Sequence, residues 1–287
     1  MLISVLALLT TSSPASAQEA SPVEPVEHEI REFTVPVGER ELMAKILSPP
    51  DEDLAEAPAL LLTFAADQDT SLLTIPYCLP AQHFLAHGHR AVSFTLPSHG
   101  TRVDAFGEGI AGWRNAFMAG EDPFSTFVAE ARALIDECMR RGWVRPGRIA
   151  VSGTSRGGYV ALRLLAADPR IAAGAGFAPV TDWRDLTEFS ADREREDVAG
   201  LRLSQMAADM ADRDVFAAIG RNDDRVSTLS CRTFIEHLRR LGATTSDGSD
   251  RVRYVETDDE GHSLADRWYA EGAEFLLRAA TRTDGSH

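Results

Sequence analysis

A serine between glycines is the feature of this sequence best suited to chemistry. The run Gly-Thr-Ser-Arg-Gly-Gly at residues 153–158 follows an apolar stretch at 149–151. A serine hydroxyl is a weak nucleophile unless it is held clear of its neighbours and next to a base. A sharp turn between a strand and a helix achieves this, and only small residues fit two positions before and after the serine, here Gly153 and Gly157. The pattern therefore predicts that Ser155 is a nucleophile, in preference to an idle serine in a glycine-rich turn.

Two later segments supply the residue types that an activated serine needs. At residues 219–226 a strand-like run gives way to Asn-Asp-Asp-Arg-Val, and an acid in such a loop can orient a histidine and stabilise its charged form. Asp223 is the first candidate for this acid, and Asp224 is the alternative. His262 follows the last strand-like segment, from where a general base can reach a serine hydroxyl. The order serine, aspartate, histidine is the one expected when all three follow strands of an α/β sheet.

The segments that must position these residues alternate between strand-like and helix-like patterns from residue 28 onward. This alternation favours a mostly parallel sheet with helices on both faces. Residues 28–37 and 42–47 are expected to open the fold as an antiparallel hairpin. The other strands are expected at 58–65, 91–96, 148–152, 171–180, 215–219 and 252–256, and helices at 81–86, 123–141, 156–167, 232–241 and 264–280.

Two segments interrupt this alternation. Residues 181–213 are polar with a helical pattern, and we expect them to form a small cap or lid inserted into a single domain that spans 28–287. Residues 101–121 have no clear period, and we expect a loop in which Trp113 lines a substrate pocket. Phe64 and Thr154, which lie at the ends of predicted strands, are the other candidate substrate contacts.

Taken together, these motifs resemble those of the α/β-hydrolase superfamily. Segments 153–158, 220–226 and 261–262 are similar to those of its dienelactone hydrolase and prolyl-oligopeptidase-like esterase branch, and the similarity covers roughly residues 40–280. The resemblance implies an α/β-hydrolase fold in which the Arg156 amide, at the helix start, stabilises an oxyanion. It also implies a second oxyanion amide after the third strand. There the usual His-Gly-Gly is replaced by Thr-Phe-Ala-Ala, so that the expected donor is Ala65.

The predicted function is hydrolysis of carboxylic esters through an acyl-enzyme, with small acyl or carbohydrate esters as substrates. A serine peptidase of the prolyl-oligopeptidase-like type would use the same residues, and a non-catalytic binding module is a third alternative. No metal or organic cofactor is required by this chemistry. The formal charge of −15 disfavours nucleic acid and anionic membranes as partners. The sequence contains no run of 18 apolar residues, so we expect no membrane-spanning helix. The sequence leaves the oligomeric state open.

The first residues of the chain indicate export. A short apolar run at 2–9 precedes Ala15-Ser16-Ala17, which fits the small-x-small rule for cleavage before Gln18. We therefore expect a signal peptide at 1–17, a flexible segment at 18–27 and a periplasmic or secreted protein. Three cysteines are too few for a disulfide framework, although one pair could form.

Overall fold

The computed structural model describes residues 27–242 and 251–282. The predicted signal peptide at 1–17, and all but the last residue of the predicted flexible segment at 18–27, lie outside these ranges. In the part of the chain that the structure describes, no helix is both long and apolar enough to cross a membrane.

One mixed sheet of eight strands forms the centre of the described chain, in the order β1-β2-β4-β3-β5-β6-β7-β8. Strand β2 pairs antiparallel with β1 and β4, whereas all pairs from β4 to β8 are parallel. The predicted opening hairpin and mostly parallel sheet are therefore confirmed. The strands are β1 (Glu29–Val37), β2 (Arg40–Ser48), β3 (Leu60–Phe64), β4 (Arg90–Phe94), β5 (Ile149–Thr154), β6 (Ile171–Phe177), β7 (Asp214–Asn222) and β8 (Val252–Glu260).

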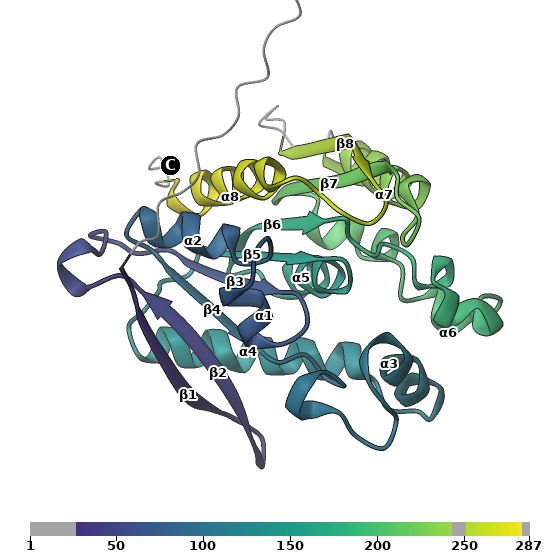
Figure 1. The fold of residues 1–287 in the computed structure, drawn as a ribbon, viewed down its shortest axis with the longest axis horizontal. Coiled ribbons are helices and arrows are strands. Elements are labelled where there is room, and N and C mark those ends of the chain that lie inside the picture. Colours follow the sequence, from purple (N-terminus) through teal and green to yellow (C-terminus); the bar gives the residue numbers. More distant parts are fainter. Residues whose placement is uncertain (1–26, 243–250, 283–287) are drawn as a thin grey trace, which may run out of the picture.

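Helices cover both faces of this sheet (Figure 1). Helices α2 and α8 pack together on one face, and α4 and α5 pack together on the other. The hydrophobic core lies between the sheet and these two layers, and it also encloses the three cysteines, all of which are free. The helices are α1 (Gln68–Leu73), α2 (Leu79–Ala86), α3 (Gly109–Met118), α4 (Pro123–Arg140), α5 (Arg156–Ala167), α6 (Glu196–Ala199), α7 (Thr228–Gly242) and α8 (Asp266–Thr281).

Helix α4 shows how local sequence sets these elements. Asp122 caps it by accepting the backbone N–H groups of Phe124 and Ser125, both at 3.0 Å, and Pro123 occupies the first helical position. Its apolar residues recur at helical spacing and are fully buried, namely Phe124, Phe127, Ala131, Leu134 and Ile135. The helix thus forms where the sequence predicts it.

Residues 101–121 do not form the loop that we expected. Residues 109–118 are helical and make up α3, which begins without a side-chain cap. Gly112 packs so closely against Gly107 that a Cβ atom would lie 2.4 Å from the Gly107 carbonyl oxygen. Its apolar residues Ile110, Trp113 and Phe117 recur at helical spacing over only two turns, so without a cap the local signal is weak and the helix depends on tertiary packing.

Residues 181–213 connect β6 to β7 through short helical turns. Besides α6, these are η3 (Trp183–Asp185), η4 (Thr187–Asp192), η5 (Leu203–Gln205) and η6 (Ala207–Met210). Trp183 and Phe189 are fully buried, and Asp192 pairs with Arg114 of α3 at 2.6 Å. The segment is therefore packed onto the domain and fixed to α3.

Candidate active site

Ser155 occupies the tight turn between β5 and α5. Its backbone has φ 57° and ψ −117°, a region that residues other than glycine seldom adopt. Two hydrogen bonds to the end of β6 hold this conformation, from the Ser155 N–H to the Phe177 carbonyl at 2.8 Å and from the Val180 N–H to the Ser155 carbonyl at 3.1 Å. The strained turn is thus fixed on both sides of the serine.

The glycines around Ser155 are required by close backbone contact. A Cβ atom on Gly157 would lie 2.0 Å from the Phe64 carbonyl oxygen, and one on Gly153 would lie 2.3 Å from the Gly157 carbonyl group. These neighbours are backbone atoms and cannot move aside as a side chain can. Only glycine therefore lets β3, β5 and α5 meet at this point.

Asp223 and His262 are joined by a hydrogen bond. His262 Nδ1 lies 2.8 Å from Asp223 Oδ2, and the Asp223 side chain is fully buried. Asp223 Oδ1 accepts the backbone N–H groups of Arg225 and Val226, both at 2.9 Å. The alternative acid, Asp224, is exposed. The geometry therefore favours Asp223 as the residue that orients the histidine.

The other ring nitrogen of His262 is available for proton transfer. Nε2 is buried and has no hydrogen-bond partner among the described residues. When Nδ1 donates its proton to a carboxylate, Nε2 carries a free lone pair, which is the tautomer of a general base. His262 and Ser155 line the same cavity, which places the general base and the nucleophile in one site.

This cavity has a volume of about 370 Å³. Pro76, Tyr77, Ile110 and Leu264 supply apolar and aromatic surface. Thr154, predicted as a substrate contact, also lines the cavity, and its hydroxyl donates a hydrogen bond of 3.4 Å to Tyr269 Oη. The cavity combines a reactive serine and histidine with apolar surface, as small-molecule sites generally do.

Comparison with known proteins identifies the family of this chain. Residues 112–283 match the model of the prolyl oligopeptidase family, and this range contains Ser155, Asp223 and His262. The chain belongs to the prolyl oligopeptidase family. It is accordingly a hydrolase of the serine type.

Solved structures similar to this family member share its fold. A Thermus thermophilus protein is 20% identical with a TM-score of 0.66, over 90% of this chain and 100% of that one. A puromycin-hydrolyzing peptidase of Mycobacterium tuberculosis is 16% identical with a TM-score of 0.65, over 94% of this chain but 41% of that one. A putative dienelactone hydrolase of Klebsiella pneumoniae is 13% identical with a TM-score of 0.64, over 90% of this chain and 100% of that one. Together with the sheet, these matches confirm the predicted α/β-hydrolase fold.

The Ala65 amide, predicted as the second oxyanion donor, is already engaged in this family member. It donates a hydrogen bond of 2.9 Å to Ser71 Oγ, which in turn donates to the Asp67 carbonyl at 2.6 Å. The next residue, Ala66, also lines the cavity, and its N–H has no acceptor in the described parts of the chain. The Arg156 N–H is the first of α5 and has no acceptor within that helix. The geometry therefore favours Arg156 and Ala66, and we correct the prediction for Ala65.

Two predicted substrate contacts are core residues. Phe64 is 1% exposed and packs edge-on against Phe94 and Phe127, with ring centroids 5.3 and 4.9 Å away. Trp113 is fully buried, packs against Trp183, and donates its indole N–H to the Pro97 carbonyl. Neither lines the cavity. Both predictions are wrong because these side chains point into the core.

Tyr77 and Arg225 are among the cavity residues that the sequence reasoning missed. Tyr77 comes from the connection between α1 and α2, which has no recognisable motif. Arg225 follows Asp223 by two positions and lines the cavity, and its backbone N–H donates to Asp223 Oδ1, which fixes the backbone there. An aspartate in a turn often accepts the backbone N–H two residues further on, and only this local rule could have indicated that Arg225 lies close to Asp223.

Proposed function

We propose that this member of the prolyl oligopeptidase family hydrolyses carboxylic esters through an acyl-enzyme on Ser155. The observation that carries the proposal is His262, whose Nδ1 is held by the buried Asp223 carboxylate. Its Nε2 has no partner in the described structure and belongs to the cavity of Ser155. A histidine oriented in this way is a general base for a serine nucleophile.

The reaction proceeds in two steps. His262 Nε2 takes the proton of Ser155 Oγ while Oγ bonds to the ester carbonyl carbon. The resulting imidazolium returns this proton to the alcohol oxygen as the carbon–oxygen bond breaks, and the alcohol leaves. Water then attacks the acyl-enzyme, gives a proton to Nε2, and releases the carboxylic acid as the serine hydroxyl is restored. The amides of Arg156 and Ala66 stabilise the oxyanion in both steps.

The size and lining of the cavity support small acyl or carbohydrate esters. Its volume of about 370 Å³ lies towards the lower end of the range of small-molecule sites, roughly 300–1,000 Å³. Its apolar lining residues can accept an acyl chain or an aromatic alcohol, and Ser155 belongs to the same lining. The second candidate function is peptide hydrolysis, which the family match favours.

A substrate panel separates the two functions. Purified native protein is assayed with aryl, alkyl and acetylated-sugar esters, and in parallel with peptide amides, with Ser155→Ala as the inactive control. We expect ester kcat/KM to exceed amide kcat/KM by orders of magnitude. Peptide turnover comparable to ester turnover would instead establish the peptidase. A fluorophosphonate should label the native protein and not Ser155→Ala, and failure to label either would show a non-catalytic binding module.

A further inference from the structure

The cavity beside Ser155 is lined by cationic groups in a protein that is acidic overall. The chain has a formal net charge of −15. Nevertheless, the charged side chains along the cavity are Arg156 and Arg225, and no Asp or Glu occurs among its lining residues within the described ranges. A concave site with one sign of charge concentrates ligands of the opposite sign. The local charge thus opposes that of the whole molecule at the place where substrate must bind.

Within the described ranges, the guanidinium of Arg156 makes no ion pair. Its Nε atom is buried and has no hydrogen-bond acceptor in the part of the chain that the structure describes. Glu188 makes its ion pair with Arg225 instead, at 2.6 Å. Burial lowers the pKa of Arg156 and the like charge of Arg225 lowers it further, while Tyr77, Glu188 and Glu108 act in the opposite direction. Because a guanidinium remains charged even so, a partly buried charge is left here without an ion pair among the described residues.

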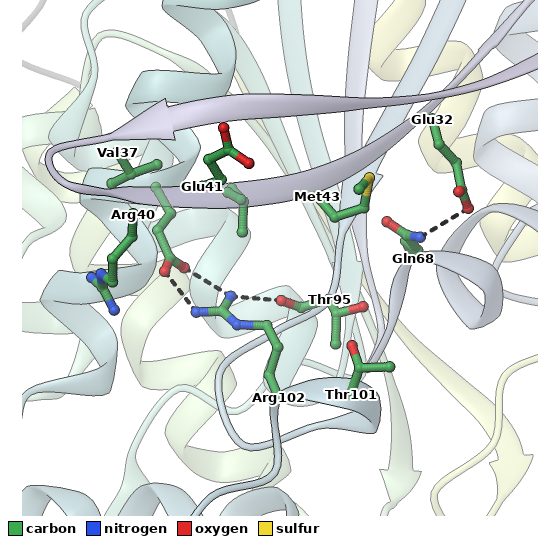
Figure 2. Close-up of a pocket in the computed structure, with 11 residues that line it drawn as sticks. Glu32, Val37, Arg40, Glu41, Met43, Gln68, Thr95, Thr101 and Arg102 are labelled. Atoms are coloured by element: carbon green, nitrogen blue, oxygen red, sulfur yellow. Dashed lines mark hydrogen bonds and ion pairs between the residues drawn. The ribbon is translucent and has the colours of Figure 1, made fainter.

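Another cavity shows how an arginine in this protein is normally satisfied (Figure 2). This second cavity, of about 390 Å³, lies against the β1–β2 hairpin and is lined by Arg102. Arg102 donates to the two carboxylate oxygens of Glu130 at 2.6 and 2.9 Å, and to the Thr95 carbonyl at 2.7 Å. Its charge and its donors are thus used within the protein. Arg156 makes no such ion pair among the described residues, although Glu188 and Glu108 act on its charge from a distance, and this sets the cavity of Ser155 apart.

We propose that Arg156, assisted by Arg225, binds a carboxylate of the substrate, so that the preferred substrates are small esters that carry a free carboxylate on the acyl or alcohol part. This inference rests on the proposed function, because it concerns the same cavity. A planar carboxylate matches the fork of guanidinium donors, and such charge-assisted bonds are stronger than neutral ones. Arg225 contributes charge nearby, although Glu188 offsets part of it.

Two matched substrate pairs test the proposal. Mono-4-nitrophenyl adipate is compared with 4-nitrophenyl hexanoate for the acyl side, and 4-acetoxybenzoate with 4-acetoxybenzamide for the alcohol side. The native enzyme should prefer the anionic member of at least one pair by kcat/KM. In Arg156→Gln, which keeps the backbone amide, this preference should fall by about 10- to 100-fold, the size of a charged hydrogen bond. Arg156→Lys should retain part of it, since lysine keeps the charge without the fork.

Arg278→Gln is the matched charge control. Arg278 lies on α8, and its side chain is 67% exposed. This variant also removes one positive charge, but it should leave the preference unchanged. Equal kcat/KM for both members of both pairs in the native enzyme, or an unchanged preference in Arg156→Gln, would overturn the inference while leaving the esterase proposal standing. If the native enzyme hydrolysed none of the four esters and resisted fluorophosphonate labelling, the proposed function itself would fail.

Discussion

The substitution Asp223→Asn is the sharpest test of how His262 is oriented. Asp223 Oδ1 accepts the amides of Arg225 and Val226 at 2.9 Å, and an asparagine carbonyl oxygen can keep both bonds. Oδ2 lies 2.8 Å from His262 Nδ1, where the asparagine NH₂ group would donate instead of accept. Nδ1 must then be the acceptor and the ring proton moves to Nε2, which can no longer take a proton from Ser155.

We expect kcat to fall by about 10³- to 10⁴-fold, equivalent to about 4–5.5 kcal/mol of transition-state stabilisation. The free energy of unfolding should change far less, by about 1–2 kcal/mol, because the two backbone bonds persist and one hydrogen bond changes its type. Initial rates with an aryl ester give kcat, and urea unfolding followed by circular dichroism gives the stability.

The neighbouring Asp224→Asn is the matched control for this experiment. Asp224 is exposed, so its removal should change kcat by less than about two-fold. The reasoning would be refuted if Asp223→Asn kept more than about a tenth of the native kcat. It would equally be refuted if Asp224→Asn lost as much activity as Asp223→Asn.

Three further predictions follow from packing and protonation. Gly157→Ala, whose Cβ atom would lie 2.0 Å from the Phe64 carbonyl oxygen, should lower the free energy of unfolding by about 3 kcal/mol or more; a native-like urea midpoint would contradict the close contact. Ser71→Ala removes the acceptor of the Ala65 amide and should lower the free energy of unfolding by about 1–3 kcal/mol. If Ala65 is structural, kcat should change by less than about three-fold. A large loss of kcat at unchanged stability would instead indicate that Ala65 contributes to the oxyanion site. Burial lowers the pKa of His99 to about 4 from its ordinary 6.5. Between these pH values the folded state binds fewer protons than the unfolded state, so the free energy of unfolding falls as the pH drops through this window. His99→Gln should show a shallower decline of the free energy of unfolding in urea titrations from pH 7 to 4, and an equal slope would argue against a neutral, buried His99.

The sequence was sufficient wherever a local rule determines the structure. The turn at Ser155 could be predicted because its glycines are demanded by backbone contact, and helix α4 because Asp122 and Pro123 mark its start. The pairing of Asp223 with His262 could be anticipated from chain order, since both follow neighbouring parallel strands, β7 and β8.

The residues that were misjudged depend on tertiary packing. Phe64 ends a strand beside the active site, but its side chain points into the core, and one residue further on the chain turns to face the cavity. Trp113 lies on a short helix that has no capping side chain, and its spacing with Ile110 and Phe117 was too brief a pattern to indicate that the indole is buried. The second oxyanion amide is one residue further along the chain than predicted, because the Ala65 N–H donates a hydrogen bond to the Ser71 hydroxyl.

The hydrogen bonds that hold Ser155 have a consequence for how this architecture can diversify. Both partners, Phe177 and Val180, precede the connecting segment at 181–213, so the nucleophile is anchored before that segment begins. The chain then rejoins the sheet at Asp214, in register with Ala173 of β6. The segment is nevertheless part of the core, because Trp183 and Phe189 are buried and the Leu201 carbonyl accepts the Tyr159 hydroxyl of α5. Change is therefore expected at its less buried positions such as Glu188, whose link to Arg225 bears on the choice of substrate rather than on the chemistry.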